Sequence, residues 1–432
     1  MRIVKVGLAI LGVASLLMLA GGTPEAFHSG GVAECAGCHS MHSPKPGGSF
    51  LLTGVDASST CLNCHQVDTD TGPSRYHIST PSSKLGAGQA PLQRTPGGDF
   101  GWVKKSYNPT GYSEDGSTHG HNIIAADYGY VVQPPVVDPV TGKISGTTAP
   151  GGTYPNSQLG CVTCHDPHSS ARRLSDGSFR TGITLGGAAQ PIIGSGSYNN
   201  SPVPVAGEAV GVYRLLRGLN QVYQGVTFSG VAIAVAPETY NQRETTNQVR
   251  VAYGASGALN TWGNWCANCH TDMHSRDGYV HPVDESLGSD VANNYNAYLK
   301  TGDLTGVAAT SYSSLVPFAE ATGDFATLAS HASNTNAYPN GPGSADKVMC
   351  LSCHRSHASG FMFGLRFDVE YEFMTKGGQY VGSNNPLVTG TRAANQHRGR
   401  TNEEWQAAYY DRPASNFATY QRVLCNKCHA KD

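Results

Sequence analysis

The chain has 432 residues, with 29 Lys and Arg against 31 Asp and Glu, so its formal net charge at pH 7 is −2. This balance excludes the strongly basic surface of a typical nucleic-acid-binding protein. The unusual feature of the composition is its 12 cysteines and 17 histidines, residue types that together indicate a metal or haem protein.

The first 26 residues predict export. Arg2 and Lys5 precede an apolar run that ends in small residues, the pattern of a secretory signal peptide with cleavage after Gly22 or Ala26. No cysteine directly follows this run, and no later apolar stretch approaches the roughly 18 residues of a membrane span. We therefore expect a signal peptide over 1–26 and a secreted protein that is extracellular or at the cell surface, without a membrane span.

Every cysteine belongs to a Cys-x-x-Cys-His unit. One helical turn places the two cysteines and the histidine on one face, so two thioether bonds can hold a porphyrin edge while the histidine reaches the iron. Disulfides would leave the histidines unexplained, and zinc sites usually combine two separated ligand pairs. The pattern therefore predicts six covalently bound haem c groups. The units are Cys35, Cys38 and His39; Cys61, Cys64 and His65; Cys161, Cys164 and His165; Cys266, Cys269 and His270; Cys350, Cys353 and His354; Cys425, Cys428 and His429.

The stretches between the motifs predict little regular structure. The chain contains 53 Gly and 24 Pro, a composition that favours turns and loops. Short strands are expected within 231–236 and 249–254. Helices are expected from an N-cap at Ser289 to Gly302, over 325–332, and after a capping box formed by Thr401 and Glu404.

We therefore expect a mostly irregular chain with a few short helices and minimal strand, a haem-organised multihaem cytochrome c fold. The intervals between motifs are too irregular for a solenoid repeat. Because six rigid apolar haems can form the core and no linker is obvious, 27–432 should be one hexahaem domain.

Six haems need up to six second axial ligands, and eleven histidines lie outside the motifs. Complete bis-histidine ligation would favour low potentials and leave no open iron for a substrate. A histidine at any of these positions could instead hydrogen-bond a propionate or a carbonyl. The preferred candidates are His42, His77, His121, His168, His281 and His357, followed by His331, His274 and His28, whereas His119 and His397 are expected to be surface histidines.

His42 lies three residues beyond His39, and the same spacing recurs at His168 and His357. The porphyrin stands between a motif histidine and the far side of its own iron, so such a short tether should serve a different haem. A haem near each chain end would also let head-to-tail contacts that do not close build a filament with a continuous line of haems. His42 is then the natural ligand for a haem of the next subunit.

The stretches "FHSGGVAEC", "TGPSRYHIST", "TPGGDFGWVKK", "WCANCHTDMH", "CLSCHRSHASGF" and "QRVLCNKCHAKD" resemble the filament-forming hexahaem surface cytochromes of metal-reducing bacteria, of the OmcS type. The resemblance implies a loop-rich fold, stacked bis-histidine haems, an extracellular conductive filament and a mature start at Phe27. It also implies that His42 ligates the haem held by Cys350, Cys353 and His354 of the adjacent subunit. The segment 43–60 is shorter than this type suggests, and His119 and His397 are additions.

These observations predict an electron carrier rather than an enzyme. It would conduct electrons to external acceptors such as metal oxides, partner cells or electrodes, and its partners would be copies of itself and outer-surface redox proteins. Two alternatives remain open: a multihaem reductase of a small oxyanion such as nitrite, and a monomeric periplasmic shuttle.

Overall fold

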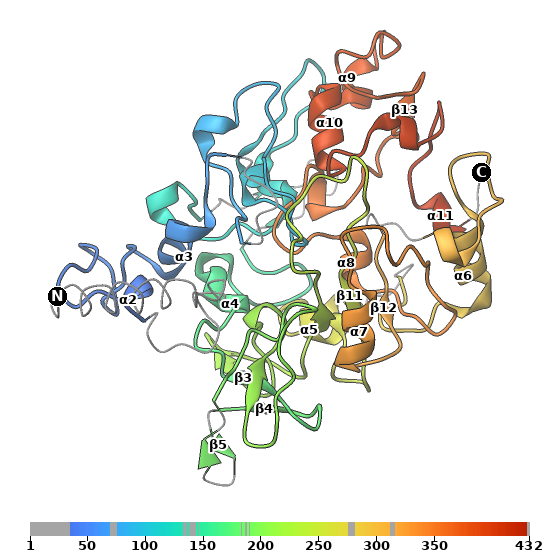
Figure 1. The fold of residues 1–432 in the computed structure, drawn as a ribbon. Coiled ribbons are helices and arrows are strands. Elements are labelled where there is room, and N and C mark those ends of the chain that lie inside the picture. Colours follow the sequence, from blue (N-terminus) through green and yellow to red (C-terminus); the bar gives the residue numbers. More distant parts are fainter. Residues whose placement is uncertain are drawn as a thin grey trace, which may run out of the picture.

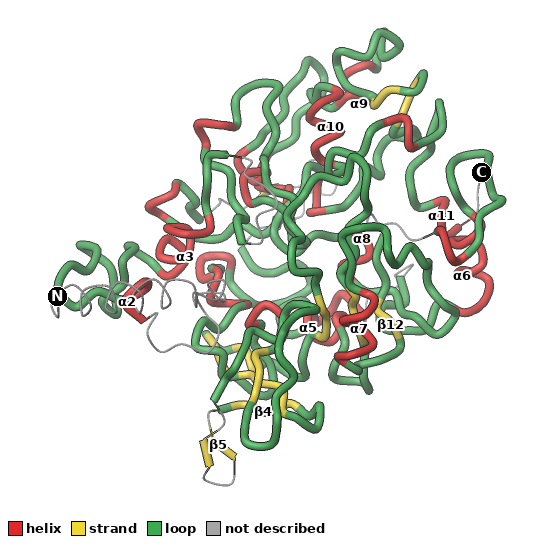
Figure 2. The backbone as a smooth tube through the Cα atoms, viewed as in Figure 1, coloured by secondary structure: helices red, strands yellow, loops and turns green. Residues whose placement is uncertain are grey.

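The computed structural model describes residues 35–69, 76–132, 136–137, 144–145, 147–182, 184–185, 188–189, 191–274, 281–311 and 316–429. The predicted signal peptide and His28 lie outside these residues. Loops and turns make up most of the described chain, and the helices and strands between them are short (Figures 1 and 2). The expected fold class, a mostly irregular chain with a few short helices and little strand, is confirmed.

Each cysteine motif lies at least partly on a short helix. Side-chain caps begin two of them, because Asp56 accepts a hydrogen bond from the Ser59 N–H and Thr261 from the Asn264 N–H. At two others the chain becomes extended at the motif histidine itself, which is the C-cap. The helices are α2 (Cys35–Cys38), α3 (Ala57–His65), α4 (Cys161–Cys164), α5 (Trp262–Ala267), α8 (Cys350–Cys353) and α11 (Asn426–His429).

The remaining α-helices confirm two expectations and correct one. α7 (Phe325–His331) and α10 (Asn402–Ala408) form where expected, and Thr401 and Glu404 make the reciprocal capping box of α10. α6 (Gly288–Ala297) differs, since Gly288 has φ of 73° and turns the chain into the helix one residue before the expected cap. It ends at Ala297, with the extended and buried Tyr298 as its C-cap, rather than at Gly302. α9 spans Ala393–His397.

The strands form small separate sheets. Two have three strands, in the orders β4-β3-β7 and β10-β11-β12, and all pairings are antiparallel except β11 with β12. β10 and β11 confirm the two expected strands. The bounds are β1 (Val136–Val137), β2 (Ile144–Ser145), β3 (Ala171–Leu174), β4 (Phe179–Thr181), β5 (Thr184–Leu185), β6 (Ala188–Ala189), β7 (Ala209–Gly211), β8 (Val222–Tyr223), β9 (Val226–Thr227), β10 (Ile233–Val235), β11 (Ala252–Gly254), β12 (Ala319–Glu320), β13 (Thr375–Lys376) and β14 (Gln379–Tyr380).

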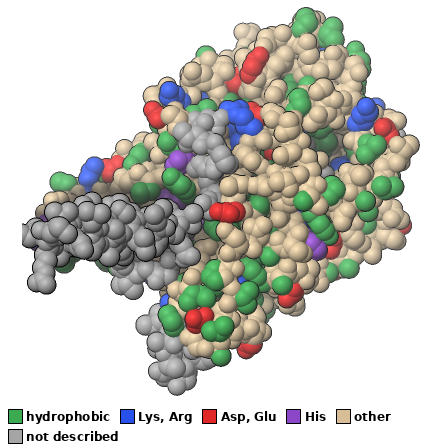
Figure 3. All heavy atoms as spheres, viewed as in Figure 1, with side chains coloured by type: hydrophobic (Ala, Val, Ile, Leu, Met, Phe, Trp, Pro, Cys, Tyr) green, Lys and Arg blue, Asp and Glu red, His purple; other side chains and the backbone are tan. Residues whose placement is uncertain are grey.

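The apolar core is aromatic and reaches the motifs. Phe361 packs against both Trp405 and Tyr409, with ring centroids 5.4 and 5.1 Å apart. Cys161 and Cys353 pack against the cluster that contains these rings. Charged side chains of both signs are interspersed on the face that Figure 3 shows. The core therefore positions the attachment cysteines, while the visible surface lacks a concentrated patch of one charge.

Candidate haem sites

The six motif helices follow one another through the molecule in chain order. α2 and α11 lie at opposite ends, with α3, α4, α5 and α8 between them (Figure 1). α3 contacts α4, and α5 contacts α8. The neighbouring Cys161 thiol raises the pKa of the Cys61 thiol, and the neighbouring Cys350 thiol raises that of Cys266. These thiols stand for the thioether sulfurs of the haem-loaded protein, so attachment edges of successive sites adjoin.

At the other three junctions, a thiol of one motif influences the pKa of a thiol of the next. The charge of Cys64 contributes to raising the pKa of the Cys38 thiol, after burial, which is the larger cause. Burial and then the charge of Cys269 raise the pKa of the Cys164 thiol. Burial and then the charge of Cys425 do the same for the Cys353 thiol. Every motif therefore lies beside the next one along the line of sites.

The first, third and fifth motif histidines are held by the same local structure, which we call the left-handed clip. The histidine Nδ1 hydrogen-bonds a backbone carbonyl whose residue, like the next one, has φ between 51° and 64°. The third clip residue forms a single antiparallel β-bridge with the histidine, and the fourth donates its N–H to the carbonyl of the second cysteine. The clips are Phe50–Thr53 at His39, Arg214–Arg217 at His165 and Phe363–Arg366 at His354, with Nδ1–oxygen distances of 2.9, 2.7 and 2.8 Å.

The clip prepares the histidine for a metal. When Nδ1 carries the proton and donates it to a carbonyl, the Nε2 lone pair is available as a ligand. His65 and His270 reach the same state without a clip, through the Tyr76 carbonyl and, at 2.8 Å, the Pro150 carbonyl. Each left-handed residue with a side chain costs about 1 kcal/mol, a strain that is typical of functional positions.

Three non-motif histidines face motif histidines at a separation that suits an iron between them. The ring centroids are 6.1 Å apart for His121 and His270, 6.4 Å for His165 and His357, and 6.2 Å for His281 and His429. Two imidazole nitrogens at about 2 Å from one metal put the centroids about 6 Å apart. The described residues contain no group of three or more His, Cys, Asp or Glu side chains arranged to hold a metal ion by themselves.

Two of these facing histidines are fixed by neighbouring backbone carbonyls. The segment 97–100 contacts His357, and Ser356 contacts His121. The His357 Nδ1 lies 3.2 Å from the Gly98 carbonyl oxygen, and its ring stacks on Phe100 at 4.6 Å. The His121 Nδ1 lies 2.5 Å from the Ser356 carbonyl oxygen. Burial lowers the pKa of His357 to about 3, so the imidazole is neutral at physiological pH, as ligation requires.

Comparison with known proteins decides the family. No protein-family model matches the chain. It is 46% identical over 455 aligned residues to the C-type cytochrome OmcS of Geobacter sulfurreducens (strain ATCC 51573 / DSM 12127 / PCA), and the match covers 99% of each chain. The chain belongs to the OmcS family.

Solved structures agree with this membership of the OmcS family. The chain matches a cryo-EM structure of OmcS nanowires from Geobacter sulfurreducens with a TM-score of 0.81, and an Outer Membrane Cytochrome S filament from the same organism with 0.80. Both matches are 46% identical and cover 94% of this chain and 100% of the other. As a member of a c-type cytochrome family, the chain binds haem c covalently, and its motifs provide six attachment sites.

Three other candidate ligands of this OmcS-family chain, His77, His168 and His42, lie within the described residues. His77 is buried, and its pKa is lowered by burial and by the neighbouring His65. The His168 side chain is 78% exposed, with Nδ1 3.6 Å from the Asp166 carboxylate. His42 is exposed beside Met41, as the expected role at a subunit junction requires.

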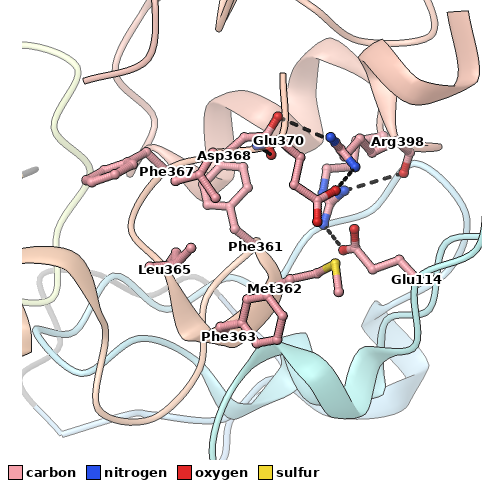
Figure 4. A pocket seen from close by; sticks show the side chains of 11 residues that line it. Glu114, Phe361, Met362, Phe363, Leu365, Phe367, Asp368, Glu370 and Arg398 are labelled. Carbon is pink, nitrogen blue, oxygen red and sulfur yellow. Dashed lines mark hydrogen bonds and ion pairs between the residues drawn. The ribbon is translucent and has the colours of Figure 1, made fainter. Parts of the chain in front are cut away.

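His119 corrects the sequence-based expectation of a surface histidine. It is fully buried, with Nδ1 2.9 Å from the Trp102 carbonyl oxygen and Nε2 2.5 Å from Glu114 Oε1. Both ring nitrogens are engaged, so His119 has a structural role. Glu114 also pairs with the buried Arg400, at the pocket beside the clip of His354 (Figure 4).

Within the described residues, two further histidines, His331 and His397, form no ring pair with a motif histidine. The His331 Nδ1 lies 2.6 Å from Glu320 Oε2, and its ring stacks on Tyr338 at 4.1 Å. The Nδ1 of the half-buried His397 accepts a hydrogen bond from the Gly399 N–H at 2.8 Å. The side chain of His274 lies outside the described residues. The hydrogen-bond partner of each Nδ1 distinguishes His331 and His397 from ligands, and the sequence does not reveal that partner.

No helix in the described part of the chain combines the length and apolar character that a membrane crossing requires.

Proposed function

We propose that this chain is an extracellular electron conduit, which polymerises head-to-tail into a filament and delivers electrons to external acceptors such as metal oxides, partner cells or electrodes. The observation that carries the proposal is the chain-ordered line of motifs from α2 to α11 (Figure 1). It is supported by the 46% identity to a protein whose solved structures are described as nanowires and filaments. The chain then acts as an electron carrier and not as an enzyme.

Bis-histidine ligation at all six sites is part of the proposal. His121, His281 and His357 would ligate the irons opposite His270, His429 and His165, as their ring separations support. His77 would serve the second site, because it is buried beside His65.

The second ligands of the first and fifth sites can be assigned by analogy with the ligand of the third site. His357 belongs to the motif of the fifth site and faces the third, so the corresponding His168 of the third would ligate the first. His42 would by the same rule ligate the fifth site of the adjacent subunit, opposite His354. Residues 39–42 of one subunit then connect two copies of the chain.

When bound, haem supplies one-electron redox chemistry. The protein fixes the histidine tautomers through backbone carbonyls and holds consecutive sites close together. Burial of the motifs among aromatic side chains lowers the pKa of His165 to about 4 and keeps it neutral. Six uniformly ligated irons would leave no exchangeable position for a substrate.

The test is the assembly state of purified holoprotein. Electron microscopy and light scattering should reveal filaments for the native chain and for the control His397→Ala, but only protomers for His42→Ala. Native protein that remains monomeric at high concentration would contradict the filament and favour a periplasmic shuttle. A high-spin haem that binds nitrite in native filaments would favour the reductase.

We also propose that a signal peptide within residues 1–26 is removed on export, by cleavage after Gly22 or Ala26, and that 27–432 form one hexahaem domain. The small residues at the end of the apolar run support cleavage. Mass spectrometry of the exported protein should find a mature start at Phe27 or at Thr23. Retention of residues 1–22 would contradict the proposed cleavage, and two separate unfolding transitions would contradict the single domain.

A further inference from the structure

The stretch that begins at His354 serves three haem sites at once. His354 is the motif histidine of the fifth site, and His357 faces His165 of the third at 6.4 Å. Between them, the Ser356 carbonyl accepts the Nδ1 hydrogen bond of His121, at 2.5 Å. His121 in turn faces the motif histidine of the fourth site. Four consecutive residues therefore fix the fifth site to the third and the fourth.

The stretch that begins at His39 has the same backbone framework. Both motif histidines are held by left-handed clips, and the residue after each donates its N–H to the second clip carbonyl. These bonds join Ser40 to Leu51 at 2.7 Å and Arg355 to Gly364 at 2.8 Å. The equivalence aligns Met41 with Ser356 and His42 with His357. Residues 39–42 are therefore built to hold two further sites, as residues 354–357 do.

Among the described residues, none supports His281 at the sixth site in the way that Ser356 supports His121 at the fourth. It faces His429 at 6.2 Å and is exposed, and within the described part of the chain neither of its ring nitrogens has a hydrogen-bond partner. At the other end of the molecule, Met41 is 78% exposed and Phe50 84% exposed. One end thus presents a histidine that needs a carbonyl, and the other presents a matching carbonyl on an apolar surface.

We propose that, in the filament, the Met41 carbonyl of one subunit accepts a hydrogen bond from Nδ1 of His281 of the partner subunit. This inference rests on the proposed filament and on ligation of the partner's fifth site by His42. The junction between subunits then repeats the junction between the third and fifth sites of one chain. Met41 acts as a positioning residue, since its carbonyl fixes the tautomer that leaves the Nε2 of His281 for the iron.

Replacing His281 by methionine separates ligation from the proposed hydrogen bond. Methionine can ligate haem iron but has no N–H to donate. The critical concentration for assembly of H281M holoprotein should therefore rise roughly three- to ten-fold. His331→Met is the matched control, because the His331 Nδ1 binds Glu320 within the subunit, and its critical concentration should equal that of the native chain. An unchanged value for H281M would overturn the inference.

A cryo-EM map of native filaments gives a second test that needs no variant. The Met41 oxygen should lie within about 3.2 Å of Nδ1 of His281 of the partner subunit. Filaments in which His42 ligates the fifth site but these atoms are more than about 4 Å apart would overturn this inference alone. Absence of filaments would instead overturn the proposed function.

Discussion

Gly98→Ala should displace His357 and remove the second ligand of the third site. Gly98 has φ of 89°, and a Cβ there would overlap the Ala358 carbonyl oxygen, in the segment that carries His357. A carbon and a carbonyl oxygen need about 3.3 Å, so that peptide must retreat. The His357 Nδ1 bond to the Gly98 carbonyl is already 3.2 Å long, near the upper limit, so the retreat breaks it.

The magnitude follows from two costs. Overpacking adds about 1–3 kcal/mol, and a left-handed alanine adds about 1 kcal/mol. Gly111→Ala isolates the second cost, because Gly111 has φ of 83° and a Cβ there meets nothing within 4 Å. Electron paramagnetic resonance of the ferric holoproteins should show one of six haems shifting to high spin in G98A and none in G111A. Identical spectra for the two variants would refute the reasoning.

The remaining predictions concern groups away from the iron sites. Glu114→Gln should cost about 3–5 kcal/mol of unfolding free energy, because it leaves the fully buried Arg400 without its carboxylate. Burial alone would raise the pKa of Glu114, but Arg400 and His119 hold it well below the ordinary value. The stabilisation from this carboxylate is therefore fully present above the unfolded pKa of about 4.3. It is lost as the pH falls towards the pKa of the folded state. Urea unfolding should show the difference between native and E114Q protein shrinking as the pH falls below about 4, and a constant difference would contradict it. Thr401→Ala should cost about 1 kcal/mol in the same assay, whereas Ser289→Ala, at a residue that caps no helix, should change it little; equal effects would contradict the cap. His397→Ala should leave the visible haem spectrum unchanged, since the His397 Nδ1 is an acceptor and Nε2 holds the proton, and loss of low-spin signal would show that it is a ligand.

Local chemistry predicted the elements that depend on neighbouring residues. A helical turn at each motif follows from the spacing of its residues, and the α10 cap follows from Thr401 and Glu404. The predicted start of α6 was wrong. Ser289 has the residue type that favours an N-cap, but the left-handed Gly288 determines where the helix begins.

Contacts distant in the sequence account for most of the rest. His119 was expected at the surface because its environment depends on Arg400, which is 286 residues from their shared partner Glu114. The carbonyls of the left-handed clips lie 11, 49 and 9 residues from their histidines. Neither Phe50 nor Arg214 is a residue type that favours a positive φ, so no sequence pattern predicts these clips.

Spin quantitation by electron paramagnetic resonance, on filaments and on His42→Ala protomers, tests the central claim most directly. The account predicts six low-spin haems per subunit in filaments, and five low-spin haems with one high-spin haem in the variant. Six low-spin haems in His42→Ala protomers would contradict a ligand shared across the junction, and a high-spin haem in native filaments would contradict complete bis-histidine ligation.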